Sequence, residues 1–208
     1  MLTLHRAASF TSRVGQLSSN VRPHSQQVGA LMTEALHTQV SRQIRIGGAT
    51  KAELLRSLAN ARVEINQAGQ QLFADDRFQT LELPAIVESV QTTAEGLGLQ
   101  NGGTFTEIAK AAAAAGLSLC PLELGPRLRL ALRDQAEGSE GFALTRHKAP
   151  PGSITVASAP LSEDDETPKG FYLRRTEGNL WLRGYRSWSG HLWEPADVFI
   201  FARTPNAA

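Results

Sequence analysis

The strongest pattern of hydrophobic and polar positions in this chain lies between residues 170 and 193. Two runs rich in aromatic and aliphatic residues flank the segment 176–179 (Thr-Glu-Gly-Asn), which is a cluster of turn-forming residues. Apolar runs on both sides of such a cluster predict a β-hairpin. We expect a two-residue loop at Glu177 and Gly178, because an even loop length keeps every side chain on a consistent face.

An even loop divides the hairpin residues into two sets, since side chains alternate between the faces of a strand. One set is apolar and is expected to pack on the core: Phe171, Leu173, Leu180 and Leu182. The other set, which we call the aromatic–arginine face, combines rings with guanidinium groups: Tyr172, Arg174, Trp181, Arg183 and Tyr185. The loop predicted above therefore places two arginines, two tyrosines and one tryptophan on one surface, while Arg175 is the one charged residue on the apolar side.

The aromatic–arginine face has two interpretations. Rings offer stacking surfaces and arginines offer forked donors for phosphate or carboxylate, so the face could bind a nucleotide, a single-stranded nucleic acid or an acidic protein surface. Alternatively, the arginines pair with the rings across the strands and only stabilise the sheet, by about 0.5–1 kcal/mol per exposed pair. His191 follows this face and precedes a turn, which makes it a sixth candidate ligand-binding residue.

Helical periodicity predicts four helices. Apolar residues recur at three- and four-residue steps from His24 to Ile46, which indicates an amphipathic helix with one apolar stripe. A capping box at residues 50–53 opens a second helix, and a third covers roughly Asn66 to Ala74. A fourth helix, rich in alanine, follows a Gly-Gly turn and a second capping box at residues 104–107.

Alternating and β-branched runs predict further strands. The predicted strands are Ala85–Thr93, Arg127–Arg133, Gly141–Arg146, Ser153–Ala159 and Val198–Ala202. In the second of these, leucines alternate with arginines, which is typical of a half-buried strand with a basic outer face. The last strand is apolar on both faces and is expected at the centre of the sheet.

These elements predict an α+β fold in which an N-terminal helical segment precedes a mixed or largely antiparallel sheet with one packed helix. Three units follow from this order. Residues 1–46 form an N-terminal arm and amphipathic helix, residues 47–82 a helical hairpin, and residues 83–204 the sheet domain.

The formal net charge is only +1, so any nucleic-acid binding must come from a local patch. No apolar run approaches the roughly 20 residues that span a bilayer, so we predict a cytoplasmic protein without membrane contact. The first 33 residues contain arginines and serines but no acidic residue. They are interpreted as a disordered or docked arm; an organellar transit peptide or an uncleaved export signal is the alternative.

A candidate catalytic centre can be assembled around Cys120, which is the single cysteine. His147 and His191 are potential bases, and the potential orienting residues are Asp134, Asp197 and Glu123. The Leu-Cys-Pro-Leu context favours an inert, buried thiol instead. A lone cysteine also excludes an internal disulfide and a paired-cysteine metal site, and no phosphate-loop, zinc or serine-hydrolase motif is present, so neither a metal nor a cofactor is predicted.

The run Ser162-Glu163-Asp164-Asp165-Glu166-Thr167 lies just before the hairpin. An acidic run of this kind is usually a solvated loop. Because it adjoins a basic surface, it could also fold over the aromatic–arginine face and compete with an anionic ligand there.

Three sequence blocks carry a resemblance to small bacterial proteins of unassigned function. The blocks are LCPLELGP (119–126), GFYLRR (170–175) and WLRGY (181–185), and the resemblance covers about residues 50–203. It implies no catalytic residue. The residues themselves favour a non-catalytic binding module that uses the aromatic–arginine face; the alternative is an exported effector or toxin-like enzyme with a Cys/His site.

Overall fold

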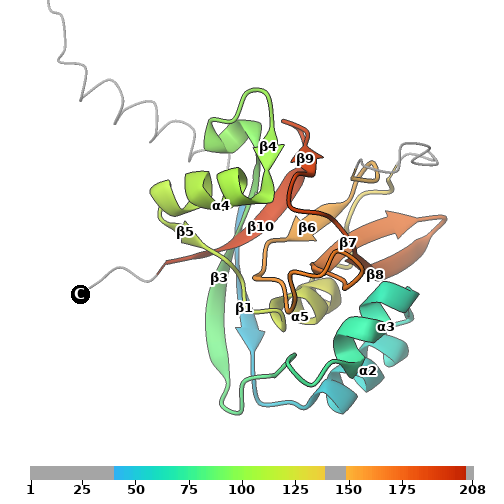
Figure 1. Cartoon of the computed structure of the whole chain (residues 1–208). Helices are drawn as coiled ribbons and strands as arrows, with labels where there is room; N and C mark the ends of the chain where they lie inside the picture. The colour runs from blue at the N-terminus through green and yellow to red at the C-terminus, as the bar shows by residue number, and fades with distance from the viewer. Residues whose placement is uncertain (1–39, 139–148, 205–208) are drawn as a thin grey trace, which may run out of the picture.

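The computed structural model describes residues 40–138 and 149–204 (Figure 1). Its strands are β1 (Val40–Ile46), β2 (Val63–Ile65), β3 (Ala85–Thr93), β4 (Gly103–Thr104), β5 (Leu117–Ser118), β6 (Ile154–Val156), β7 (Gly170–Thr176), β8 (Asn179–Tyr185), β9 (Leu192–Trp193) and β10 (Val198–Arg203). Its helices are α2 (Lys51–Asn60), α3 (Gln67–Ala74), α4 (Phe105–Ala114), α5 (Leu124–Ala131) and the short 3₁₀ helix η1 (Glu95–Leu97).

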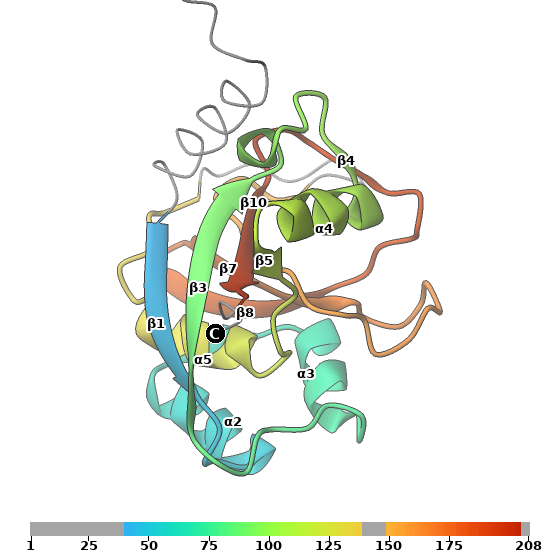
Figure 2. The same ribbon diagram turned by 90° about the vertical axis from the view of Figure 1, so that its left-hand side faces the viewer.

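One eight-stranded sheet dominates the fold, with the order β1-β3-β10-β6-β7-β8-β2 and β5 paired beside β10. Neighbouring strands are antiparallel except in the pairs β10–β6 and β2–β8. The sheet is curled, and α5 contacts β1 near one edge as well as β7 and β8 in the other half (Figures 1 and 2). A separate two-stranded sheet joins β4 to β9.

Apolar side chains bury on both sides of this sheet. The concave side packs against α2, α3 and α5, and its core includes Leu58, Leu72, Leu128 and Leu173. The opposite side packs against α4 and includes Ile108, Trp193 and Phe199. Residues of β10 contribute to both cores, which confirms the central strand predicted at Val198–Ala202.

The hairpin forms as predicted. β7 and β8 pair antiparallel, with Tyr172 opposite Arg183 and Arg174 opposite Trp181. Both loop residues have positive φ, 52° at Glu177 and 74° at Gly178, which is the backbone conformation of a type I′ turn. This turn follows the right-handed twist of the two strands and fixes their register.

Several other local signals are also confirmed. Thr50 and Thr104 each cap a helix through a complete capping box, and Asn66 caps α3. The strand predicted at Ala85–Thr93 is β3, with the same bounds. Of the segment 153–159, only Ile154–Val156 form a strand, β6.

The expected fold class is wrong, because the described residues form mostly a curled sheet and the described end of the predicted N-terminal helical segment is not helical. Residues 40–46, the end of the helix predicted from His24 to Ile46, form the edge strand β1 instead. Ile44 and Ile46 point inward at a spacing of two, because pairing with β3 buries alternate side chains. The rest of that prediction, residues 24–39, lies outside the described residues. The chain is mostly a curled sheet with short helices packed on it.

The strand predicted at Arg127–Arg133 is also wrong, because residues 124–131 form α5. Leu124 and Leu128 are buried one helical turn apart. This helical spacing of buried leucines, rather than the alternation of leucine and arginine, determines the secondary structure of the segment. The expected basic outer face is lost as well. Arg129 is fully buried and donates to Gln135 Oε1, and burial together with the nearby Arg175 lowers the pKa of Arg129 to about 10.

The strand predicted at Gly141–Arg146 falls within residues that the structure does not describe. The three predicted units stay a prediction, although β1 and β2, from the first two units, are hydrogen-bonded into the sheet formed by the third. Within residues 40–138 and 149–204, no helix combines the length and the apolar character needed to cross a membrane.

Candidate functional site

Two adjoining cavities lie on the outer face of the β7–β8 hairpin. The first has a volume of about 400 Å³ and is lined by Tyr172 and Tyr185, which are both on the aromatic–arginine face. Trp188, His191 and Trp193, from the segment after β8, form another part of its wall. The aromatic–arginine face therefore borders a cavity at one end, where it meets β9 and the loop between β8 and β9.

Edge-to-face ring contacts build the wall of the first cavity. The Trp193 ring lies at 89° to the rings of both Tyr185 and His191, with centroid distances of 5.8 Å and 4.8 Å. Trp193 also packs on Phe199 of β10, which connects the wall to the core beneath α4. Burial raises the pKa of Tyr185. Its hydroxyl therefore stays protonated at neutral pH and can donate a hydrogen bond.

Guanidinium groups flank the first cavity at Tyr172. Burial raises the pKa of Tyr172, while the positive charges of Arg183 and Arg174 act in the opposite direction. Arg183 lies over the Trp181 ring at 4.9 Å from the ring centroid. Its Nε is buried and has no hydrogen-bond partner among the described residues. The guanidinium of Arg183 is thus held by an aromatic ring, and no ion pair joins it to a carboxylate within the described residues.

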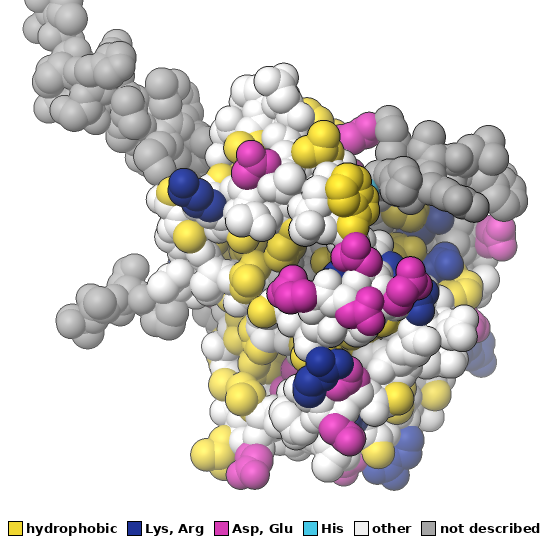
Figure 3. All heavy atoms as spheres, viewed as in Figure 1, with side chains coloured by type: hydrophobic (Ala, Val, Ile, Leu, Met, Phe, Trp, Pro, Cys, Tyr) yellow, Lys and Arg dark blue, Asp and Glu magenta, His cyan; other side chains and the backbone are white. Residues whose placement is uncertain are grey.

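The acidic segment before β7 forms the opposite rim. Asp165 and Glu166 line the first cavity, and acidic side chains gather over this segment in the middle of the face in Figure 3. Both side chains are exposed to solvent. The segment is therefore solvated, and it also reaches the edge of the aromatic–arginine face.

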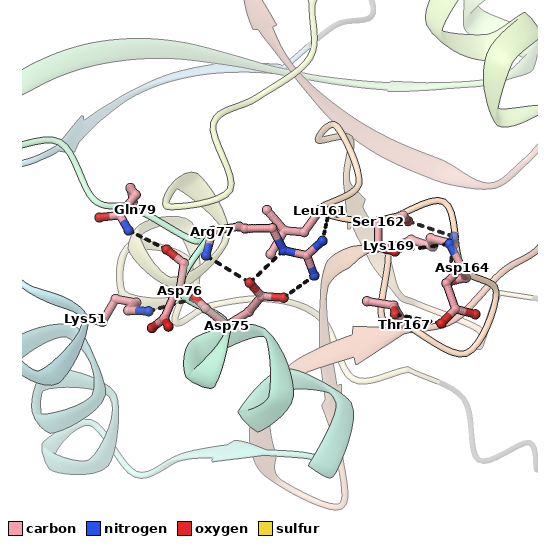
Figure 4. Close-up of polar contacts among 10 residues, drawn as sticks. All are labelled: Lys51, Asp75, Asp76, Arg77, Gln79, Leu161, Ser162, Asp164, Thr167 and Lys169. Atoms are coloured by element: carbon pink, nitrogen blue, oxygen red, sulfur yellow. Dashed lines mark hydrogen bonds and ion pairs between the residues drawn. The ribbon is translucent and has the colours of Figure 1, made fainter.

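Basic side chains hold this acidic segment through its backbone. Lys169 Nζ donates to the carbonyl oxygens of Ser162 and Asp164, both at 3.0 Å, and Arg77 donates to that of Leu161 at 2.6 Å (Figure 4). Arg186 donates to the carbonyl of Glu166 at 2.5 Å. These contacts fix the backbone of the acidic segment beside the cavities.

The second cavity has a volume of about 360 Å³ and shares Tyr185, Trp188 and Asp165 with the first. Ser158 lines it and is only 2% exposed, and the Ser158 hydroxyl has no hydrogen-bond partner within the described parts of the chain. In the first cavity, the indole Nε1 of Trp193 is likewise buried without a described partner. Unpartnered buried donors are costly, so each is a candidate contact for a ligand.

Of the six residues predicted to bind a ligand, three line the first cavity: Tyr172, Tyr185 and His191. Arg174 and Arg183 lie beside Tyr172, and Trp181 lies against Arg183. Their role in binding stays a prediction. Sequence reasoning missed Trp188 and Trp193. The signal that could have found them is a pair of tryptophans around His191 in a segment rich in glycine and serine.

The geometry of Cys120 does not support a nucleophile. The thiol is 4% exposed, and Sγ contacts the carbonyl oxygen of Ile200 at 3.4 Å. Burial raises the Cys120 pKa, so little thiolate exists at neutral pH. Among the proposed orienting residues, Glu123 is occupied by an ion pair with Arg127, and the potential base His147 lies outside the described residues.

We predict that Cys120 is unreactive until the protein unfolds. A thiol reagent added at neutral pH should modify the native protein much more slowly than the urea-denatured protein, because only the thiolate reacts and the native thiol is buried. Reagent absorbance followed over time measures both rates. Rapid modification of the native protein would contradict the burial described here.

The described residues contain no group of three or more His, Cys, Asp or Glu side chains placed to hold a metal ion.

Comparison with known proteins found no matching family model, no matching curated protein and no matching solved structure. The resemblance carried by the three sequence blocks therefore stays a prediction, and the function is argued from the site alone.

Proposed function

We propose that this protein is a non-catalytic binding module for a small phosphate-bearing ligand with a flat ring, which is the chemical class of a nucleotide. The observation that carries this proposal is the position of Arg183. Its guanidinium lies close to Tyr172, which lines the first cavity, although Arg183 itself does not line it. Its buried Nε has no partner among the described residues.

The ring of the ligand occupies the first cavity. Tyr172, Tyr185 and Trp188 line this cavity, and Trp188 is half-exposed. Aromatic side chains stack with flat rings largely irrespective of the identity of the base. The Nε1 of Trp193 requires an acceptor, which a ring nitrogen or carbonyl oxygen of the ligand supplies.

The phosphate lies at the Arg183 end of the cavity. Arginine presents a planar fork of donors that matches phosphate, and Arg174 adds a second positive charge beside Tyr172. Asp165 and Glu166 occupy another part of the wall, where they repel an anion. The arginines beside Tyr172 and the carboxylates of the acidic segment therefore orient the ligand, with its phosphate next to Tyr172.

A small molecule is favoured over a single-stranded nucleic acid or an acidic protein surface. The cavity volume of about 400 Å³ lies within the range of small-molecule sites. A polyanion tracking along the hairpin would also meet the acidic segment before β7. A cytoplasmic location, and export through the N-terminal segment, both stay predictions.

We predict that Arg183→Ala weakens nucleotide binding about tenfold or more, because it removes charge-assisted hydrogen bonds to phosphate. Isothermal titration with AMP and ATP at low salt measures the dissociation constants. Arg56→Ala is the matched control, since Arg56 is exposed on α2 and should leave the affinity unchanged.

The same titration is repeated with a short single-stranded oligonucleotide and with a glutamate-rich peptide. Tighter binding of either one would replace the nucleotide as the preferred ligand. Absence of binding by all of these probes, or equal loss in Arg183→Ala and Arg56→Ala, would rule out the proposed use of the aromatic–arginine face.

A further inference from the structure

From the second cavity we infer a separate subsite that takes a neutral ring bearing several hydroxyl groups, which is the chemical class of a sugar. The cavity adjoins the first one through Tyr185 and Trp188, but Tyr172, the residue beside Arg183, lines only the first cavity. The inference therefore goes beyond the proposed function and does not depend on where a phosphate binds.

The wall of the second cavity offers both donors and acceptors. Ser158 presents a buried hydroxyl without a described partner, and such a group can donate and accept. Lys169 has three N–H bonds, two of which are directed to the carbonyls of Ser162 and Asp164. Glu163 and Asp165 add carboxylate acceptors. A sugar matches this mixture because each of its hydroxyl groups also donates and accepts.

The charges in the wall select against ionic groups. Glu163 and Asp165 repel an anion, so a phosphate is disfavoured in this cavity. The ammonium group of Lys169 repels a cation and lies in the same wall. A neutral polar group avoids both repulsions and still hydrogen-bonds to all these side chains.

Apolar side chains supply the remaining surface. Phe105 and Pro160 line the cavity, and the ring of Trp188 is 52% exposed. Gly190 lies against the Trp188 ring so closely that an added Cβ would come within 2.3 Å of it. The ring is thus supported on one side by backbone, and its exposed surface is free to pack against the C–H face of a sugar.

The indole N–H signals of the three tryptophans provide the test. In ¹⁵N-labelled full-length protein, these signals are assigned by replacing each tryptophan with phenylalanine. The protein is then titrated with ribose, glucose and N-acetylglucosamine, and separately with AMP. We expect at least one sugar to shift the Trp188 signal and to leave the Trp181 signal, beside Arg183, unchanged.

Ser158→Ala and Asp165→Asn should each weaken sugar binding about tenfold, because the first removes a hydroxyl from the wall and the second replaces a charged acceptor by a neutral amide. Ser57→Ala is the matched control, since Ser57 is exposed on α2 and binds only the carbonyl of Glu53. The indole spectrum also verifies that each variant is folded.

The inference is overturned if none of the three sugars shifts the Trp188 signal at high millimolar concentration. It is also overturned if both cavity variants bind as tightly as Ser57→Ala. The nucleotide proposal fails separately, through absence of AMP binding. The two outcomes are therefore distinguishable in a single set of spectra.

Discussion

Glu123→Ala is expected to lower the free energy of unfolding by about 3–5 kcal/mol, because it removes a buried carboxylate that pairs with the partly buried Arg127 and accepts from two backbone N–H groups. Glu123 is 1% exposed, and its carboxylate lies 2.9 Å from Arg127 Nη2. It also accepts hydrogen bonds from the backbone N–H groups of Gly47 at 2.8 Å and Leu81 at 3.0 Å. One side chain thus joins α5 to the end of β1 and to the segment before β3. Urea denaturation followed by circular dichroism measures the loss.

Glu88→Ala is the matched control for this experiment. Glu88 pairs with Arg203 at 2.8 Å, but both side chains are 38% exposed, so the expected loss is about 1 kcal/mol or less. Glu123→Gln keeps an acceptor oxygen and should fall between the two. If Glu123→Ala and Glu88→Ala cost the same, burial does not set the strength of the Glu123 interaction.

Gly184→Ala is expected to cost about 3 kcal/mol or more, since it forces apart two backbone segments in close contact. A Cβ on Gly184 would lie 2.5 Å from the carbonyl carbon of Ala68 and 2.5 Å from the nitrogen of Gly69. Asn66 also accepts from the Gly184 N–H at 2.8 Å and donates to its carbonyl at 3.0 Å. The start of α3 is therefore fixed against β8 and cannot move aside without losing these bonds. Urea denaturation again measures the change.

The contrasting variant is Gly178→Ala in the hairpin turn. Gly178 has a φ of 74°, but nothing lies within 4 Å of an added Cβ. Its cost is therefore limited to the backbone strain, about 1–2 kcal/mol. A smaller loss for Gly184→Ala than for Gly178→Ala would mean that α3 does not approach β8 as closely as described.

The parts of the fold that follow from local chemistry could be predicted from sequence. The hairpin register depends on the two-residue loop at Glu177, and that turn was evident from its residue types. The starts of α2 and α4 depend on capping boxes, which act within a few residues. Such signals are short-range, so distant packing does not change them.

The secondary structure of the two segments that were predicted wrongly depends on partners that are distant in the sequence. Residues 40–46 become a strand because β3 pairs with them, and no property of the segment alone shows this. Residues 127–131 become part of a helix because α5 packs inside the curl of the sheet. In that position the helix buries Arg129, a residue that sequence reasoning had placed on a solvent-facing strand.

The candidate site was predictable only in part, for the same reason. Strand alternation correctly placed Tyr172 and Tyr185 on one face. Ser158 and Asp165 reach the site from the segment before the hairpin, and Trp188 reaches it from the segment after. These segments meet only because the chain folds back over the hairpin, and their residue types carry no signal of that convergence.

The parallel pairing of β2 with β8 has a consequence for biosynthesis. Val63 pairs with Leu180, so β2 has no partner until a strand much later in the sequence has been made. Until then β2 is unpaired. The apolar side chains of α3, which later pack beneath β7 and β8, are exposed to solvent during this time. This edge of the sheet therefore cannot form until β8 has been translated, and nascent chains stopped before β8 should be recognised by chaperones or degraded.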